Sequence, residues 1–162
     1  MGHHAARRVT PRKRVRRTRR GDFEVRLSEG ERELLRSLPV QLRDLLDTDD
    51  PSLVRLFPPA YLDDPERDAE YQRLMREDLL ARHADALGRL EATADATRLA
   101  EDELLAWMRA LNSLRLVLGT RLDVSEDLHT LPDDDPRAPT FAVYSYLGWL
   151  EEQVVDALGE PG

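Results

Sequence analysis

Residues 99–119 have the sequence LAEDELLAWMRALNSLRLVLG, the most apolar stretch of the chain. Its large apolar side chains recur every three or four residues, so they share one wide face of a helix. These residues are Leu104, Trp107, Met108, Leu111, Leu114 and Leu118. We predict a helix from Leu99 to about Leu118, ended by Gly119, which forms the centre of a helical core.

Weaker helical patterns lie on both sides of this stretch. Ser28 and Glu31 form a capping box that starts a helix running to Asp47, and Pro39 is expected to kink or break it. A short helical turn is expected over 53–57. Asp64 and Pro65 begin a long helix to about residue 90, and a last helix covers 141–158. We predict a core-facing stripe on the 65–90 helix, formed by Tyr71, Met75, Leu79, Ala86, Leu87 and Leu90.

The N-terminal part of the chain has a different pattern. Val15, and then Phe23, Val25 and Leu27, flank a turn at 19–22 and predict two short strands. Residues 91–98 are expected to be a polar, alanine-rich connection. The predicted fold is mainly α: an antiparallel bundle of four to five helices with a small N-terminal β-hairpin. Residues 1–12 are predicted to be a disordered basic arm, and 13–160 a single helical domain.

The charges are divided unevenly. The first twenty residues carry nine basic side chains and no acidic one, whereas residues 21–162 carry 15 basic and 32 acidic side chains, a net charge of −17. A polyanion would be repelled by the second part and attracted by the first. We expect sequence-independent DNA contact there, although a solubilising tail is the simpler alternative. The candidate phosphate contacts are Arg12, Lys13, Arg14, Arg16, Arg17, Arg19 and Arg20.

Several function classes find no support in the sequence. The absence of cysteine excludes thiol catalysis, disulfides and cysteine-ligated metals within this chain. Phosphate-binding glycine loops and hydrolase or zinc-protease motifs are also absent. His83 lies on the apolar stripe, which favours a structural role, and His129 lies in an acidic loop that is expected to be solvated. We therefore expect a cytoplasmic protein that is not an enzyme, needs no cofactor and does not contact the membrane.

Three polar residues interrupt the apolar central helix. Asn112 and Arg115 lie one turn apart beside its leucines, and Arg121 follows near its end. Buried polar groups need partners, so we expect Arg115 to meet a carboxylate of the 65–92 helix, Glu77 or Asp78. The alternative is that Asn112, Arg115 and Arg121 form an interaction site.

Three stretches also carry a family resemblance. They are LFPPAY at 56–61, EYQRLM at 70–75 and LNSLRLVLGTRL at 111–122. With them, the chain resembles the actinobacterial family of oxidative-stress transcriptional regulators called AosR, formerly a domain of unknown function. The resemblance implies transcriptional regulation under oxidative stress, with cysteine chemistry as the sensor in the named members. Since this chain has no cysteine, that sensing step is not carried over.

Together these observations favour a regulator that acts through protein contacts. The expected partner is a protein of the transcription machinery, such as RNA polymerase or a sigma factor, while the basic arm touches DNA phosphates. The alternative is an interaction adaptor in proteolysis or sulfur metabolism that does not bind DNA. The oligomeric state is left open by the sequence.

Overall fold

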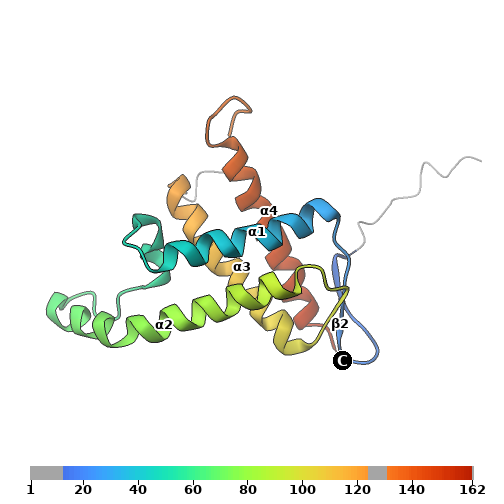
Figure 1. Cartoon of the computed structure of the whole chain (residues 1–162), viewed down its shortest axis with the longest axis horizontal. Coiled ribbons are helices and arrows are strands. Elements are labelled where there is room, and N and C mark those ends of the chain that lie inside the picture. The colour runs from blue at the N-terminus through green and yellow to red at the C-terminus, as the bar shows by residue number, and fades with distance from the viewer. Residues whose placement is uncertain (1–12, 124–130, 162) are drawn as a thin grey trace, which may run out of the picture.

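The computed structural model describes residues 13–123 and 131–161. Within these residues the prediction of a mainly α fold with a small N-terminal sheet is confirmed (Figure 1). The elements are β1 (Val15–Arg17), β2 (Phe23–Val25), α1 (Glu29–Leu46), the 3-10 helix η2 (Pro51–Leu56), α2 (Pro65–Thr93), β3 (Arg98–Leu99), α3 (Glu101–Leu122) and α4 (Ala138–Leu158). The predicted arm 1–12 and His129 lie outside the described residues.

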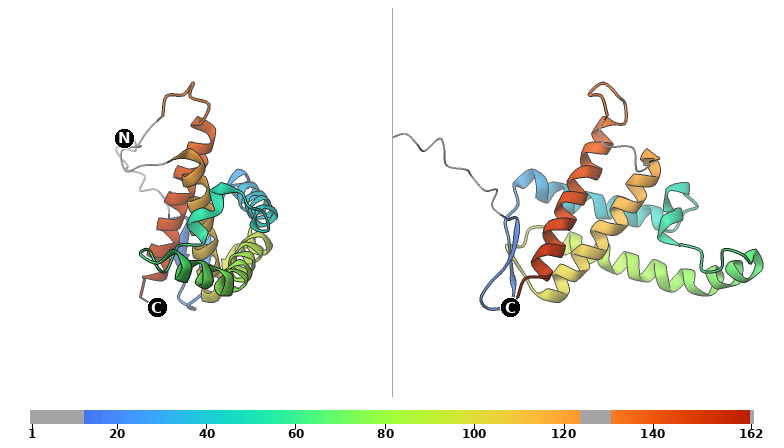
Figure 2. Two further views of the ribbon diagram at one scale, coloured as in Figure 1. Left: turned by 90° about the vertical axis from the view of Figure 1, so that its left-hand side faces the viewer. Right: turned by 180° about the vertical axis from the view of Figure 1, so that it is seen from behind.

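The helices form two antiparallel pairs that cross each other. α1 lies beside α2, and α3 lies beside α4, with the two pairs stacked across one another (Figures 1 and 2). The core lies where the pairs meet. It contains Trp107, Leu111, Leu87 and Leu147, all fully buried. The central stretch of the sequence is therefore the centre of the fold.

The small sheet has one strand more than predicted. β1 and β2 form the expected antiparallel hairpin, with Gly21 at φ 92° in its turn. Arg98 and Leu99, placed by the sequence in a connection and at a helix start, instead form β3 and pair with β2. Two residues are too few to show a strand pattern, so only the pairing with β2 defines this strand.

The first helix follows the predicted capping box but is not broken by proline. The Ser28 amide donates to Glu31 Oε1 at 2.9 Å, and the Glu31 amide donates to Ser28 Oγ at 3.2 Å. α1 then runs through Pro39 to Leu46, and Pro39 is buried on the same face as Leu35 and Leu42. Packing of this face against the core offsets the lost backbone hydrogen bond, so the expected break does not occur.

Gly119 does not end the central helix, as the sequence had suggested. α3 continues to Leu122 and ends at Asp123, whose backbone is left-handed with φ 52°. Gly119 is buried, and a Cβ placed on it would lie 3.2 Å from Cε1 of Tyr144. The glycine therefore allows α4 to approach α3 closely.

Only part of the predicted stripe on α2 is buried. Ala86, Leu87 and Leu90 belong to the core, whereas Tyr71, Met75 and Leu79 are half-buried. Figure 1 shows the reason: the first half of α2 extends past the other helices at one end of the molecule. The stripe was predicted over the full helix because periodicity identifies a face without showing where its covering neighbours end.

Candidate functional site

The outer face of the sheet gathers basic side chains from three separate parts of the chain. Val15, Phe23 and Leu99 point into the core, so the alternating residues of the strands point outward. The strand register places Arg16, Glu24 and Arg98 in one row across the sheet. One carboxylate thus lies between two guanidinium groups.

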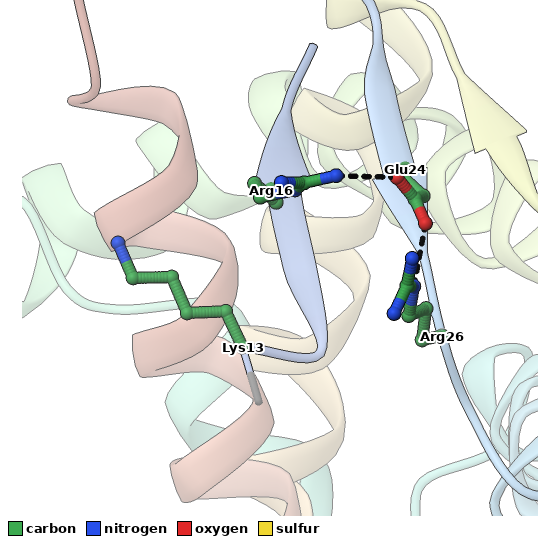
Figure 3. A pocket seen from close by; sticks show the side chains of 4 residues that line it. All are labelled: Lys13, Arg16, Glu24 and Arg26. Carbon is green, nitrogen blue, oxygen red and sulfur yellow. Dashed lines mark hydrogen bonds and ion pairs between the residues drawn. The ribbon is translucent and has the colours of Figure 1, made fainter. Parts of the chain in front are cut away.

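Glu24 is shared by two arginines. Arg16 Nη2 donates to Glu24 Oε2 at 2.9 Å, and Arg26 Nε donates to Oε1 at 2.5 Å (Figure 3). These hydrogen bonds, from Arg16 first and Arg26 second, hold the pKa of Glu24 below its usual value. With Lys13, these residues line a hollow of about 310 Å³. Three cations and one carboxylate give this hollow a net positive charge, which suits an anion.

The hairpin turn extends this basic surface. Arg19 and Arg20 are exposed, and the turn beneath them is fixed by a hydrogen bond from Thr18 Oγ1 to Asp22 Oδ1. That bond, opposed by burial and assisted by Arg98, lowers the pKa of Asp22. We call the exposed residues Lys13, Arg16, Arg19, Arg20, Arg26 and Arg98 the basic sheet face.

Two of the predicted phosphate contacts, Arg14 and Arg17, also contact the helices, although the Arg14 side chain stays 41% exposed. Arg17 has a side chain 13% exposed, packs over the Phe23 ring at 4.6 Å and donates to the Leu158 carbonyl at 3.3 Å. Arg14 lies 3.4 Å from Glu31 and 5.8 Å from the centre of the Trp149 ring. These contacts tie β1 to α1 and α4, so both arginines have structural roles.

Four of the predicted phosphate contacts lie on the basic sheet face, and their contact with nucleic acid stays a prediction. Lys13, Arg16, Arg19 and Arg20 belong to the basic sheet face, and Arg12 lies outside the described residues. Sequence reasoning missed Arg26 and Arg98. The alternation along 23–27 could have placed Arg26 beside Glu24, whereas Arg98 depends on the unpredicted pairing of β3.

Asn112, Arg115 and Arg121 do not form one cluster. Asn112 is exposed, so it needs no buried partner. Arg121 lies beside η2, where its Nη2 is 3.7 Å from Asp50 Oδ2 and its Nε donates to Ser52 Oγ at 3.3 Å. The expected pairing of Arg115 with Glu77 or Asp78 is wrong, because Arg115 faces α4 rather than α2.

Arg115 lies in a groove between α3 and α4. Its Nη1 donates to Glu151 Oε1 at 3.1 Å, and its guanidinium lies 5.3 Å from the centre of the Tyr144 ring. Gly148 makes room for it, since a Cβ there would lie 3.2 Å from Arg115 Nε. The groove has a volume of about 450 Å³ and is bordered by Trp149, Glu152, Val155 and Asp156. We call it the α3–α4 groove.

His83 has contacts at both ring nitrogens. Its Nε2 donates to the Leu56 carbonyl at 3.1 Å, and its Nδ1 lies 3.2 Å from Ser113 Oγ. Ser113 is buried, so this pair is closed to a substrate, in agreement with the structural role expected for His83. Among the residues that the structure describes, no group of three or more side chains is arranged to hold a metal ion.

No helix in the described ranges has the length and apolar character needed to cross a membrane.

Residues 12–158 match the family model described as "Domain of unknown function (DUF2017)". The protein named oxidative stress regulator AosR is 37% identical over 133 residues in Mycobacterium bovis and in Mycobacterium tuberculosis strain H37Rv. The match covers 78% of this chain and 57% of each relative, and no solved structure matches. The chain thus belongs to the DUF2017 family, in agreement with the resemblance to AosR found in its sequence.

Proposed function

We propose that this protein is a non-enzymatic cytoplasmic regulator of the response to oxidative stress that acts on transcription. The relationship to proteins named oxidative stress regulator AosR supports the stress role. The basic sheet face supports contact with nucleic acid and is the observation that carries this part of the proposal. In this proposal the sheet lies against DNA phosphates while another surface contacts a protein of the transcription machinery, RNA polymerase or a sigma factor.

The basic sheet face has the charge and exposure that phosphate contact requires. Its side chains are solvent-accessible, with exposures of 58% for Arg16 and 55% for Arg98. Arginine also suits phosphate oxygens because its planar group can donate two parallel hydrogen bonds. The face contains no helix positioned to enter a groove of DNA, so the expected binding is independent of base sequence.

The α3–α4 groove is the surface proposed for the protein contact. Trp149 and Val155 are 38% and 47% exposed, and Glu152 and Asp156 lie beside them. An exposed tryptophan is typical of an interface anchor. A partner surface with an apolar patch and basic edges would complement it.

DNA binding is tested by fluorescence anisotropy with a random-sequence duplex over a salt series. If about four phosphates are neutralised, log affinity should fall with log salt at a slope of about −4. The double variant Arg16→Gln/Arg26→Gln should bind at least about tenfold more weakly and reduce the slope by about two. Arg55→Gln/Arg73→Gln removes the same charge from exposed positions of η2 and α2, away from the sheet, and should leave binding unchanged.

A deletion that tests the N-terminal arm must leave strand β1 intact. Removing residues 1–20 would remove β1, whose Val15 is buried in the core, so lost binding would then report misfolding. Removing residues 1–12 leaves β1 in place and separates the contribution of the arm from that of the basic sheet face. Equal binding by parent and Arg16→Gln/Arg26→Gln would contradict the proposed DNA interface.

The adaptor alternative rests on the acidic character of the chain, which opposes DNA contact beyond the basic region. It requires no DNA binding even at low salt together with retained protein binding. Measuring binding of purified RNA polymerase to the parent and to Trp149→Ala separates the two functions. Loss with Trp149→Ala supports the groove, whereas no binding by the parent favours the adaptor.

A further inference from the structure

The projecting end of α2 exposes large apolar side chains that the fold does not cover. Leu62 is 82% exposed, Leu74 is 69% exposed and Tyr61 is 38% exposed. Figures 1 and 2 show this end, with the loop before α2, lying beyond the other helices. Exposed apolar groups gathered on one projection are typical of a surface that binds another protein.

The loop before α2, which we call the α2 tip (residues 60–64), is held in place by side chains. Asp68 Oδ1 accepts hydrogen bonds from the Ala60 amide at 2.7 Å and from the Tyr61 amide at 3.2 Å. The Tyr61 ring packs edge-on against Tyr71, with centres 6.2 Å apart. The tip therefore presents Leu62 in a fixed position, which reduces the entropy lost on binding.

One outward face of α2 continues from this tip. Arg67, Tyr71, Leu74, Asp78 and Ala81 are spaced alternately by four and three residues, so they form a straight seam along the helix. Leu74 points away from the core because it lies nine residues before His83, half a turn round the helix, and His83 packs inward on Leu56 and Phe57. Within this chain, Arg67 packs over the Tyr61 ring at 4.9 Å and Asp78 pairs with Arg82 at 3.0 Å. Leu74, between them, stays 69% exposed.

A hollow lies at the far end of the same seam. It occupies about 560 Å³ between α2 and α3, and its floor includes the small side chains of Ala81, Ala86 and Ala106. Arg82, Arg89 and Arg109 stand around it with the acidic Asp85. The hollow thus has an apolar floor and a rim of arginines, of which Arg82 pairs with Asp78 and Arg89 with Asp85. The tip combines the apolar Leu62 with the acidic Asp63 and Asp64.

We propose that a second copy of this chain covers the seam, with the two α2 helices antiparallel about a twofold axis. Tyr71 of each copy then lies against Leu74 of the other, and Arg67 lies against Asp78 of the other. Leu62 of each copy enters the hollow of the other, where Asp63 and Asp64 meet its basic rim. A second copy fits this surface because the antiparallel arrangement places each acidic, apolar tip beside the arginines and alanines of the other copy's hollow.

The size of the proposed interface determines the affinity expected for the dimer. About five helical turns and a short loop from each copy give an interface near the lower limit for specific complexes. We therefore expect a reversible dimer with a dissociation constant in the micromolar range, on the order of 10 μM. Sedimentation equilibrium of the 162-residue chain from 1 to 200 μM should show the mass increasing from monomer to dimer.

Apolar substitutions locate the interface. Leu62→Asp and Leu74→Glu replace exposed side chains, so both variants should fold as the parent does and weaken the dimer at least tenfold. Val40→Glu introduces a charge at an exposed valine of α1 and should leave the dimer unchanged. A chain that remains monomeric at 200 μM, or a dimer that withstands both leucine substitutions, would overturn the proposal.

Charge exchange tests the antiparallel register. Arg67→Asp alone and Asp78→Arg alone each place like charges across both ends of the proposed interface, so each should dimerise more weakly. An equimolar mixture of the two variants restores opposite charges at both ends and should form a heterodimer. Residues 67 and 78 lie about 16 Å apart along one helix, too far for an ion pair within one copy. Failure of the mixture to associate more strongly than either variant would contradict the register.

Discussion

The central helix α3 and the projecting half of α2 both carry apolar side chains at helical spacing, but their surroundings differ. Leu114 on α3 is 4% exposed, whereas Tyr71, Met75 and Leu79, in the stripe of α2, are only half-buried. Neighbouring α2, α4 and η2 all pack on α3, but the first half of α2 lies beyond α1 and α3. The difference shows that helical periodicity specifies an apolar face, and that the lengths of the neighbouring elements decide whether this face stabilises the fold or remains available to a partner.

Truncation of a core leucine should give the largest loss of stability and so tests this comparison first. Leu111→Ala removes a fully buried side chain from α3 and should lower the free energy of unfolding by about 3 kcal/mol. Leu74→Ala makes the same chemical change on the projecting half of α2 and should cost less than about 0.5 kcal/mol. Urea unfolding at a protein concentration below that of the proposed dimer measures both values. Equal losses would show that the projecting half is packed as tightly as the core.

The hydrogen bonds accepted by two carboxylates provide a second test, with a smaller expected loss of stability. Glu31 accepts hydrogen bonds from the Ser28 amide and from the Tyr146 hydroxyl, and Arg14 lies nearby. Burial alone would raise the pKa of Glu31, but these donors and this positive charge lower it overall. Glu31→Gln should therefore cost about 1 to 2 kcal/mol at neutral pH. Asp68→Asn alters the hydrogen bonds that Asp68 accepts from the Ala60 and Tyr61 amides at the exposed α2 tip. It should lower the free energy of unfolding by less than about 0.5 kcal/mol.

The pH dependence of Glu31→Gln follows from the sign of this shift. A carboxylate with a lowered pKa stabilises the folded state fully above its ordinary pKa, 4.5 for glutamate, and loses that contribution as the pH falls through the lower folded-state value. The difference in stability between parent and Glu31→Gln should shrink below about pH 4.5. A difference that is constant from pH 7 to pH 3 would show that the charge of Glu31 is not involved.

Local signals in the sequence predicted the parts of this molecule that depend on few residues. The capping box at Ser28, the proline start of α2 and the hairpin turn are confirmed because each is determined within a few residues. The wrong predictions concern features that depend on packing between distant parts of the chain. Gly119 was interpreted as a terminus because its contact with Tyr144 is invisible in the sequence.

In the candidate site, too, the sequence indicated a local property, the basic character of the segment, but not the packing of each side chain. The density of arginines predicted a basic region, and four of its six described members form part of the basic sheet face. Arg14 and Arg17 pack on Trp149 and Phe23, which the sequence did not indicate, since nothing in an arginine-rich segment distinguishes a side chain that packs on a ring from one in solvent. Arg98 was missed because 74 residues separate it from Glu24, its neighbour across the sheet.

Arg115 provides the finest test of the comparison, with the smallest expected effect. A fully buried Arg115 would have cost about 3 to 5 kcal/mol on replacement by alanine. Its side chain is 33% exposed, however, and its partner Glu151 is 18% exposed, so solvent screens the pair. Arg115→Ala should therefore lower stability by about 1 kcal/mol. The exposed Arg73 pairs with Glu70 at 3.9 Å on the projecting half of α2, and Arg73→Ala should have no measurable effect. If Arg115→Ala melts with the parent but no longer binds RNA polymerase, the arginine serves the partner rather than the fold, and the α3–α4 groove is the interaction site.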